Sequence, residues 1–267
     1  MKRTDEGAVV LPGTESVLIS RENDCATITL NQPEKLNALG TELMEGLHAA
    51  LDKTLGNQSQ PPVKLIVFRA NGKGFSGGLD LSGLDAESDG DLLLRLVRIE
   101  QLLQRVRHAS CATAAFVHGA CYGAAADLVL ACRARIATAD ARFLMPGMRF
   151  GIVLGTQRLR DTVGENAAYQ LLDRLAPFKS DEALATGYLT RVAEPTDWPE
   201  VTQQLLYSLS GFSSSAYANR VSSLTPDTRA ADMQALVRSV TESSIKSRML
   251  VYLQQAKSER RTHSGGG

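Results

Sequence analysis

The sequence carries no net charge and no long apolar run, and these two absences exclude several classes of function. Its 267 residues include 29 basic and 29 acidic side chains, so the formal net charge at pH 7 is zero. Such a chain has no overall field to attract nucleic acid or an anionic membrane. Residues 1–13 contain acids and only a short apolar stretch, which is typical of neither a signal peptide nor a membrane span. We therefore expect a cytoplasmic protein whose partner is a small molecule.

Cysteine is scarce and is not arranged for metal or redox chemistry. The four cysteines form no C-x-x-C pair, and no two of them share metal-ligand spacing with a histidine. Three lie inside apolar segments, where cysteine usually serves as a small buried hydrophobe. The sequence therefore predicts no metal site and four reduced, structural cysteines: Cys25, Cys111, Cys121 and Cys132.

The first half of the chain alternates strand and helix signals. Residues 16–20 and 25–30 are apolar and β-branched around a turn, which predicts a hairpin. Parallel strands joined by right-handed crossovers are the usual product of such alternation. Further strands are expected at 64–68, 111–117, 134–138 and 142–145, and helices at 41–55, at 92–107 and directly after Gly123.

Strand signals nearly vanish after about residue 156, and the remaining segments are typical of helices. These are 165–175, 180–187, 198–210, 213–224 and 228–258. A chain of this length can bury a core without disulfides or metal. We therefore expect an N-terminal extension (1–15), an α/β core (16–210), a C-terminal helical region (211–260) and a disordered tail (261–267).

The glycine-rich turn 72–78, Gly-Lys-Gly-Phe-Ser-Gly-Gly, matches the dinucleotide fingerprint G-x-G-x-x-G by letter. That fingerprint must open directly onto a helix whose N-terminal amides receive a pyrophosphate. Here it opens onto residues 79–91, which contain five acids and no base. Because this segment would repel a pyrophosphate, binding of a nicotinamide nucleotide is disfavoured.

The same turn matches the nucleophile elbow G-x-S-x-G of serine hydrolases, with Ser76 as the nucleophile. A triad needs an acid and then a histidine downstream of the serine. His108 ends a predicted helix, His118 ends the next strand and His263 lies in the tail, so none is well placed to follow an acid. The hydrolase interpretation is disfavoured as well.

Five motifs considered together favour a third interpretation. They are 31–39 (NQPEKLNAL), 75–81 (FSGGLDL), 119–127 (GACYGAAAD), 139–143 (ADARF) and 155–159 (GTQRL). They occur in the order and at roughly the spacing found in the crotonase superfamily, also called the enoyl-CoA hydratase/isomerase family, which the chain resembles from about residue 16 to 210. One such motif alone would be weak evidence. The resemblance implies an α/β fold of the ClpP/crotonase type, with repeated strand–strand–helix (ββα) units and a C-terminal helical region used for trimer assembly.

The resemblance also implies a site that polarises a thioester carbonyl with two backbone N–H groups. The donors would be the N–H groups of Leu79 and Ala124, because chemistry on an acyl-CoA puts negative charge on the thioester oxygen. Both positions are physically sensible, since glycines precede each one and a helix N-terminus has unpaired N–H groups. The family's CoA adenine and phosphates lie near the first motif, so Lys35 and Leu36 are candidate contacts, although a solvated loop lysine fits equally well.

The resemblance breaks down at the catalytic acids. Family hydratases use two carboxylates, one to activate water and one to handle the proton on the α-carbon. This sequence keeps a shorter version of the first, Asp127, but has Gly147 where the second is usual, and its 151–155 loop is about three residues short. Near a helix N-terminus Asp127 is expected to be ionised and to suit a base, or to serve only the helix dipole. Other groups that could supply a proton, for which core roles fit better, are Tyr122, His118 and Cys121.

We therefore expect an acyl-CoA-binding enzyme of the enoyl-CoA hydratase/isomerase type, acting in fatty acid metabolism. The resemblance implies no cofactor beyond the CoA that carries the substrate, and a homotrimer or a dimer of trimers. Two alternatives remain open. One is a non-hydratase relative such as an isomerase, decarboxylase or thioesterase, although family isomerases commonly keep the carboxylate that Gly147 replaces. The other is a non-catalytic acyl-CoA carrier or regulatory pseudo-enzyme on the same scaffold.

Overall fold

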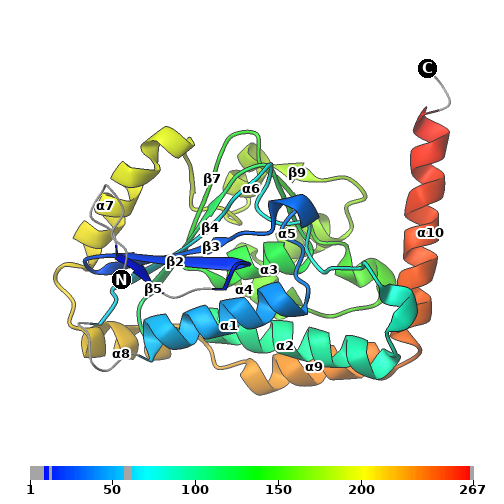
Figure 1. Cartoon of the computed structure of the whole chain (residues 1–267), viewed down its shortest axis with the longest axis horizontal. Coiled ribbons are helices and arrows are strands. Elements are labelled where there is room, and N and C mark those ends of the chain that lie inside the picture. Colours follow the sequence, from blue (N-terminus) through cyan, green and yellow to red (C-terminus); the bar gives the residue numbers. More distant parts are fainter. Residues whose placement is uncertain (1–8, 12–13, 57–61, 265–267) are drawn as a thin grey trace.

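Two β-sheets form the core of the computed structural model, which describes residues 9–11, 14–56 and 62–264 (Figure 1). In the large sheet the three N-terminal strands are antiparallel and the rest are parallel, as the alternation of elements predicts. Its order is β1 (Val9–Leu11), β2 (Val17–Glu22), β3 (Cys25–Leu30), β4 (Leu65–Ala70), β5 (Ala112–Val117), β7 (Ala134–Ala137) and β10 (Arg191–Val192). The predicted hairpin is β2 and β3.

A second, three-stranded sheet contains one of the two strands expected between residues 134 and 145. The expected strand at 134–138 joins the large sheet as β7, whereas the one at 142–145 becomes β8 of the small sheet. Strand β1 was not predicted. It lies inside the expected N-terminal extension (1–15) and pairs with β2. The small sheet consists of β6 (Ala120–Tyr122), β8 (Arg142–Leu144) and β9 (Phe178–Lys179).

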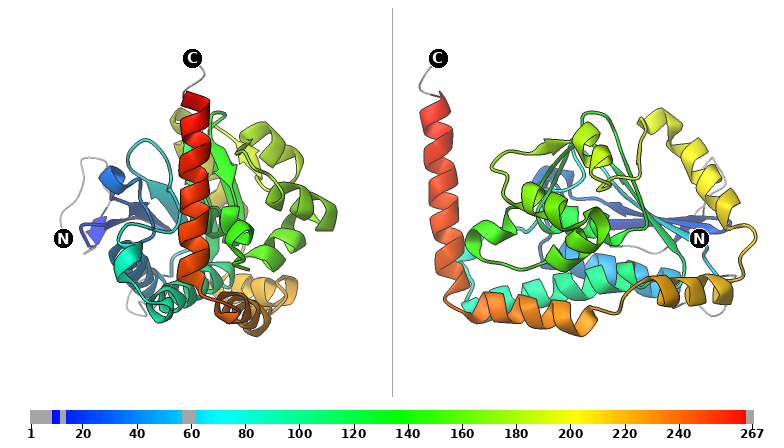
Figure 2. Two further views of the ribbon diagram at one scale, coloured as in Figure 1. Left: turned by 90° about the vertical axis from the view of Figure 1, so that its right-hand side faces the viewer. Right: turned by 180° about the vertical axis from the view of Figure 1, so that it is seen from behind.

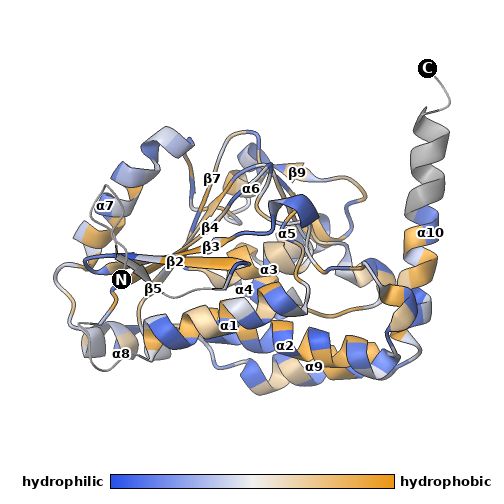
Figure 3. Ribbon diagram, viewed as in Figure 1, coloured by the Kyte–Doolittle hydropathy of each residue, from blue (hydrophilic) through white to orange (hydrophobic). Residues whose placement is uncertain are grey.

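Helices cover both faces of the large sheet (Figures 1 and 2). Apolar residues of α1 (Thr41–Leu55), α2 (Asp89–Arg107) and α3 (Ala124–Ala131) join the main core on one face. On the other face α7 (Trp198–Leu209) packs Trp198 against Phe116 of β5, with ring centroids 5.2 Å apart. Figure 3 shows α1, α2 and α9 with apolar and polar residues interspersed, as expected for helices with one solvated side.

Helix α2 begins three residues before the predicted start because it has its own capping box. The Ser88 hydroxyl accepts a hydrogen bond from the Asp91 N–H, and the Asp91 carboxylate accepts one from the Ser88 N–H. This reciprocal pair satisfies two donors that a helix start otherwise leaves unpaired. Residues 88–91 of the acidic segment after the glycine turn therefore form the N-terminus of α2.

The helical region follows the core as expected, but the segment 228–258 divides into two helices. The chain turns between them at residues 242–244, and the second helix, α10, projects away from the body (Figure 2). Its base is fixed to the start of α2, because the Lys246 ammonium donates to the carbonyls of Asp85 and Glu87. The helices are α4 (Thr156–Val163), α5 (Glu165–Leu172), α6 (Ser180–Ala185), α8 (Ser214–Leu224), α9 (Arg229–Thr241) and α10 (Ile245–Ser264). The expected tail at 261–267 begins within α10, and its residues 265–267 lie outside the described part.

A buried ion cluster fixes α4 between α2 and α9. The Arg158 guanidinium donates to both carboxylate oxygens of Glu100, at 2.9 and 2.5 Å, and to Asp232 at 3.1 Å. The three side chains are 3%, 1% and 7% exposed. Removing one partner of such a pair leaves an uncompensated buried charge, so the cluster constrains where α4 begins. Across the described residues, no helix combines the length and apolarity needed to span a bilayer.

Candidate active site

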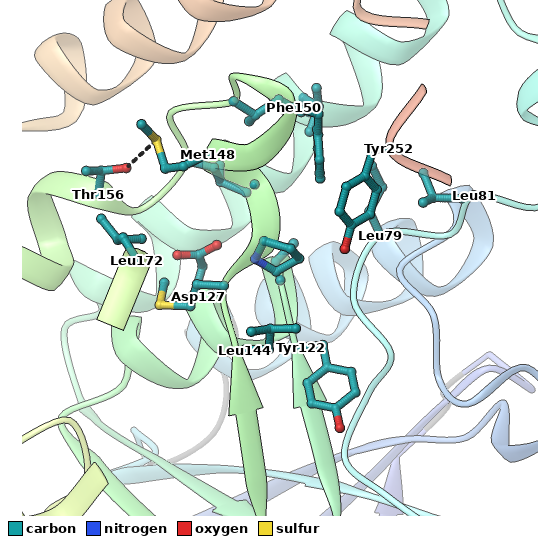
Figure 4. Close-up of a pocket in the computed structure, with 18 of the residues that line it drawn as sticks. Leu79, Leu81, Tyr122, Asp127, Leu144, Met148, Phe150, Thr156, Leu172 and Tyr252 are labelled. Atoms are coloured by element: carbon teal, nitrogen blue, oxygen red, sulfur yellow. Dashed lines mark hydrogen bonds between the residues drawn. The ribbon is translucent and has the colours of Figure 1, made fainter. Parts of the chain in front are cut away.

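A mostly apolar cavity of about 470 Å³ lies between the glycine turn, α3, the segment 144–156 and α10 (Figure 4). Its size is typical of a small-molecule site, and a few polar groups stand among leucine, methionine and aromatic side chains. The three residues expected to be catalytic, Leu79, Ala124 and Asp127, all line it. The sequence therefore identified residues that the fold brings together.

Among the described residues, the glycine turn leaves the N–H of Leu79 without an acceptor. The Gly78 carbonyl accepts from the Leu39 N–H and the Asp80 N–H donates to the Leu39 carbonyl, so the groups on either side of it are paired. A Cβ at Gly78, whose φ is +87°, would overlap the Tyr122 carbonyl oxygen. Only glycine fits there. No described residue accepts a hydrogen bond from the Leu79 N–H.

The second amide is held beside the first by a short parallel pairing. The Ser76 N–H donates to the Ala120 carbonyl, and the Tyr122 N–H donates to the Ser76 carbonyl. Gly123 then starts α3 with φ of 54° and no side-chain cap. The N–H of Ala124, the first residue of the helix, has no acceptor among the described residues. The two residues whose N–H groups have no acceptor in the described part of the chain therefore line one cavity, next to the positive end of a helix dipole.

Asp127 is the one carboxyl group that lines the cavity within the described part of the chain. It lies in the first turn of α3, it is 4% exposed, and its Oδ1 has no hydrogen-bond partner among the described residues. Burial raises its pKa to about 8, while the positive charge of Arg158 lowers the pKa less and Glu100 raises it. The carboxyl is therefore mostly protonated at neutral pH. The expectation of an ionised base was wrong, because desolvation outweighs the helix dipole.

Gly155, at the start of α4, makes room for Asp127. A Cβ at Gly155 would overlap Asp127 Oδ1, and φ there is +69°. Gly83, the N-cap of the short helical segment η2 (Leu84–Ala86), is also left-handed, with φ of +79° and ψ of 7°, and has nothing within 4 Å of its Cβ position. The two glycines therefore share backbone strain and differ in contact with Asp127.

We expect Gly155→Ala to destabilise the protein by about 1–3 kcal/mol more than Gly83→Ala. Both variants pay the cost of a left-handed residue, roughly 1–2 kcal/mol, and only Gly155→Ala adds overpacking against a buried group, which typically costs about 1–3 kcal/mol. Urea unfolding of the two variants and the wild type measures the difference. Equal losses would mean that Asp127 moves aside freely.

Gly147 lines the cavity within the short helical segment η3 (Pro146–Phe150), so no acid projects from this position. The Ile152 N–H donates to the Gly147 carbonyl at 2.9 Å, which closes the short loop. Arg248 of α10 donates to the carbonyls of Phe150 and Gly151. The segment 147–152 is thus fixed by its own backbone hydrogen bond and by the Arg248 side chain.

The remaining candidates have other roles or lie at the margin. The Ser76 hydroxyl donates to the Asn37 carbonyl at 2.6 Å and accepts from the Gly78 N–H, so it supports the turn. Tyr122 lines the cavity, but its ring points away from Asp127 (Figure 4). Lys35 and Leu36 do not line the cavity; the Leu36 carbonyl accepts from the Gly77 N–H, which places this pair beside the glycine turn. Neither His118 nor the fully buried Cys121 lines it.

Sequence reasoning missed Tyr252 of α10. Its ring packs on Phe150, with centroids 5.1 Å apart, and its hydroxyl points into the cavity (Figure 4). No local pattern marks this residue, because it reaches the site only through the turn at 242–244. The signal that existed was amphipathic: apolar residues of α10, Met249 among them, join a third apolar cluster beside the cavity.

Comparisons with known proteins agree with the geometry. The family model described as enoyl-CoA hydratase/isomerase matches residues 20–261. A solved structure from Bordetella parapertussis, assigned to an enoyl-CoA hydratase/isomerase, has a TM-score of 0.86 and 39% identity, and the match covers 90% of this chain and 99% of that one. A Bacillus subtilis protein assigned as an enoyl-CoA hydratase is 32% identical over 171 residues, which are 62% of this chain and 64% of that protein. The short-chain-enoyl-CoA hydratase of Clostridium acetobutylicum is 29% identical over 199 residues, covering 71% and 73%.

Proposed function

The chain belongs to the enoyl-CoA hydratase/isomerase family of the crotonase superfamily, and we propose that it binds acyl-CoA thioesters in the cavity and acts at their α- and β-carbons. The observation that supports this most is the pair of free N–H donors, from Leu79 and Ala124, that share the cavity with the Asp127 carboxyl. The apolar lining of the cavity suits an acyl chain.

The two N–H groups would bind the thioester oxygen. When the α-carbon gains or loses a proton, the thioester becomes an enolate whose negative charge rests on that oxygen. Fixed donors in a cavity that excludes water stabilise this charge, and losing one donor typically costs roughly 3–4 kcal/mol. Leu79 and Ala124 act through their backbones, so their side chains serve only to line the site.

Asp127 would handle one proton. In hydration of an enoyl thioester, the oxygen of water bonds to the β-carbon, a proton adds to the α-carbon, and the attacking water loses a proton. A carboxyl that is protonated at neutral pH can donate the proton to the α-carbon. With Gly147 in place of an acid, no second carboxylate from the described residues lines the cavity to take the proton from water. We therefore propose an enzyme of this family whose hydratase rate is low.

Two other functions use the same binding site. A non-hydratase relative, such as an isomerase, decarboxylase or thioesterase, would need only the oxyanion site and one proton-handling group. A carrier or regulatory pseudo-enzyme would need the binding site alone. Turnover of a panel of enoyl-, 3-hydroxyacyl- and malonyl-type CoA thioesters distinguishes these: tight binding without turnover of any member favours the carrier.

The binding proposal predicts that crotonyl-CoA binds and NAD does not. The turn that matches a dinucleotide fingerprint leads into the acidic segment 80–91 and the short helical segment η2 (Leu84–Ala86), without the helix that would receive a pyrophosphate. Calorimetric titration of the purified protein with each compound measures this. Binding of NAD without binding of crotonyl-CoA would refute the proposal.

CoA contacts at Lys35 and Leu36 remain part of this proposal, as does a homotrimer or dimer of trimers. Both positions lie beside the glycine turn, where the CoA portion would leave the cavity, and Leu36 is 58% exposed. Helix α10, which projects away from the body (Figure 2), offers surface for assembly. Light scattering measures the assembly directly.

A further inference from the structure

A second cavity adjoins the first. It has a volume of about 460 Å³ and lies between α4 and α5. Three residues, Met148, Thr156 and Leu172, line both cavities. The side chains of these residues therefore form a shared wall, next to Asp127 in Figure 4.

The second cavity has an apolar floor and a polar rim. Ala168 and Leu172, which come from one side of α5, form the floor together with Met148, and Tyr169, which is 63% exposed, borders it. The rim consists of Gln157, Arg160, Glu165 and Asp173. Arg160 is already paired with Asp161 at 2.9 Å. An uncharged hydrocarbon chain suits this lining, whereas a charged head group finds no unpaired basic partner among the described residues of the rim.

Met148 is the movable part of the wall. An unbranched methionine side chain has three rotatable bonds and adapts to irregular space. Met148 is 42% exposed, and its polar contact is weak, since the Thr156 hydroxyl lies 4.0 Å from its sulfur. Its backbone belongs to η3, which Arg248 fixes through the Phe150 and Gly151 carbonyls. The side chain can swing while the backbone stays in place.

We propose that Met148 gates the second cavity, and that this cavity takes the distal methylene groups of linear acyl chains longer than crotonyl. The inference rests on the proposed acyl-CoA function. An acyl chain whose α- and β-carbons lie near Asp127 can extend toward the shared wall, because Met148, Thr156 and Leu172 line the same cavity as Asp127. Met148 then sets which chain lengths the protein accepts.

The test compares the dissociation constants of crotonyl-CoA and decenoyl-CoA by calorimetry. Their ratio cancels contacts with CoA and needs no turnover. Met148→Ala opens the wall and should shift the ratio roughly tenfold toward decenoyl-CoA, because each buried methylene is worth about fourfold in affinity. Met148→Trp fills the opening and should shift it roughly tenfold the other way. Tyr169→Asp puts a charge beside the apolar floor and should weaken binding of decenoyl-CoA more than binding of crotonyl-CoA.

Leu175→Ala is the matched control, because this leucine is 80% exposed and lines neither cavity. Leu175→Ala should keep the wild-type ratio of the two dissociation constants. A ratio unmoved by Met148→Ala, or moved in the same direction by both Met148 variants, would overturn the gate while leaving the acyl-CoA proposal intact. If Met148→Trp does not fold, Met148→Ala alone decides. Failure of the wild type to bind either thioester would instead overturn the proposed function, and the gate with it.

Discussion

Asp127→Asn is expected to stabilise the protein at pH 8 while removing turnover. An unfolded aspartate has a pKa of about 3.9, whereas burial raises the folded value to about 8. Between these two values the folded state holds a proton that the unfolded state has lost. The stabilisation is therefore complete below about pH 3.9 and declines by about 1.4 kcal/mol per pH unit until the pH passes the folded pKa.

Asparagine has nearly the same shape as aspartic acid and stays neutral. Residue 127 of the variant therefore causes no decrease in the free energy of unfolding as the pH rises. The Asp127→Asn variant and the wild type should have similar unfolding free energies at pH 4, and the variant should be more stable by several kcal/mol at pH 8. Thermal unfolding from pH 4 to 9 measures this. Asp85→Asn, at an exposed position away from the cavity, is the control and should show no such divergence. A variant less stable than the wild type throughout would mean that the folded state stabilises the ionised carboxylate.

The same substitution removes the proposed proton donor. General acid–base assistance typically contributes roughly 10²–10⁴-fold, so turnover should fall by that factor or to background. Activity of the wild type should also decrease as the pH rises through about 8, because the carboxyl then loses the proton that it donates. Gain of stability together with loss of turnover separates a catalytic carboxyl from one that serves the helix dipole, whose removal would destabilise α3.

Local patterns were enough to predict most of the elements and the position of the site. The hairpin, α1, α2, β4 and β5 follow from periodicity and turn residues within each segment. The motifs correctly grouped Leu79, Ala124 and Asp127 around one cavity. Backbone geometry explains this success, because Gly78 and Gly123 each occupy a conformation that their own short motif specifies.

Features that depend on distant contacts were not predictable. The charge state of Asp127 follows from burial by segments far along the chain, whereas its position in α3 favours ionisation. The ion cluster of Arg158 with Glu100 and Asp232 joins three helices that share no local pattern. Tyr252 reaches the cavity only because α10 turns away from α9. In each case tertiary packing supplies the decisive energy.

Gly147→Glu is expected to raise a low rate of crotonyl-CoA hydration. A Cβ at Gly147 would lie 3.4 Å from the Ile152 carbonyl oxygen and 4.0 Å from the Ile152 Cβ, and the glycine does not have a positive φ. The new side chain therefore starts in ordinary contact, at a position that lines the cavity. Two carboxylates can then divide the work, one donating to the α-carbon and one taking the proton from water.

The size of the gain depends on placement. A second acid–base group is worth roughly 10²–10⁴-fold when well positioned, and about 1 Å of error can cost roughly 10²-fold. Because the 151–155 loop is short, we expect a gain of about ten- to a hundredfold. The loss of crotonyl-CoA absorbance at pH 7 measures the rate. Gly147→Gln, of the same shape but without a carboxylate, is the control and should give no gain, as should Gly147→Glu combined with Asp127→Asn.

The low rate of crotonyl-CoA hydration expected of the wild type tests the assignment of the acid–base groups. If the wild type hydrates crotonyl-CoA as fast as ordinary members of the family, another group must take the second proton. Tyr122 is poorly placed because its ring points away from Asp127, whereas the Tyr252 hydroxyl points into the cavity (Figure 4). Tyr252→Phe would then reduce the rate and Tyr122→Phe would not. A fast wild type that tolerates both substitutions would show that the assignment of the acid–base groups is wrong.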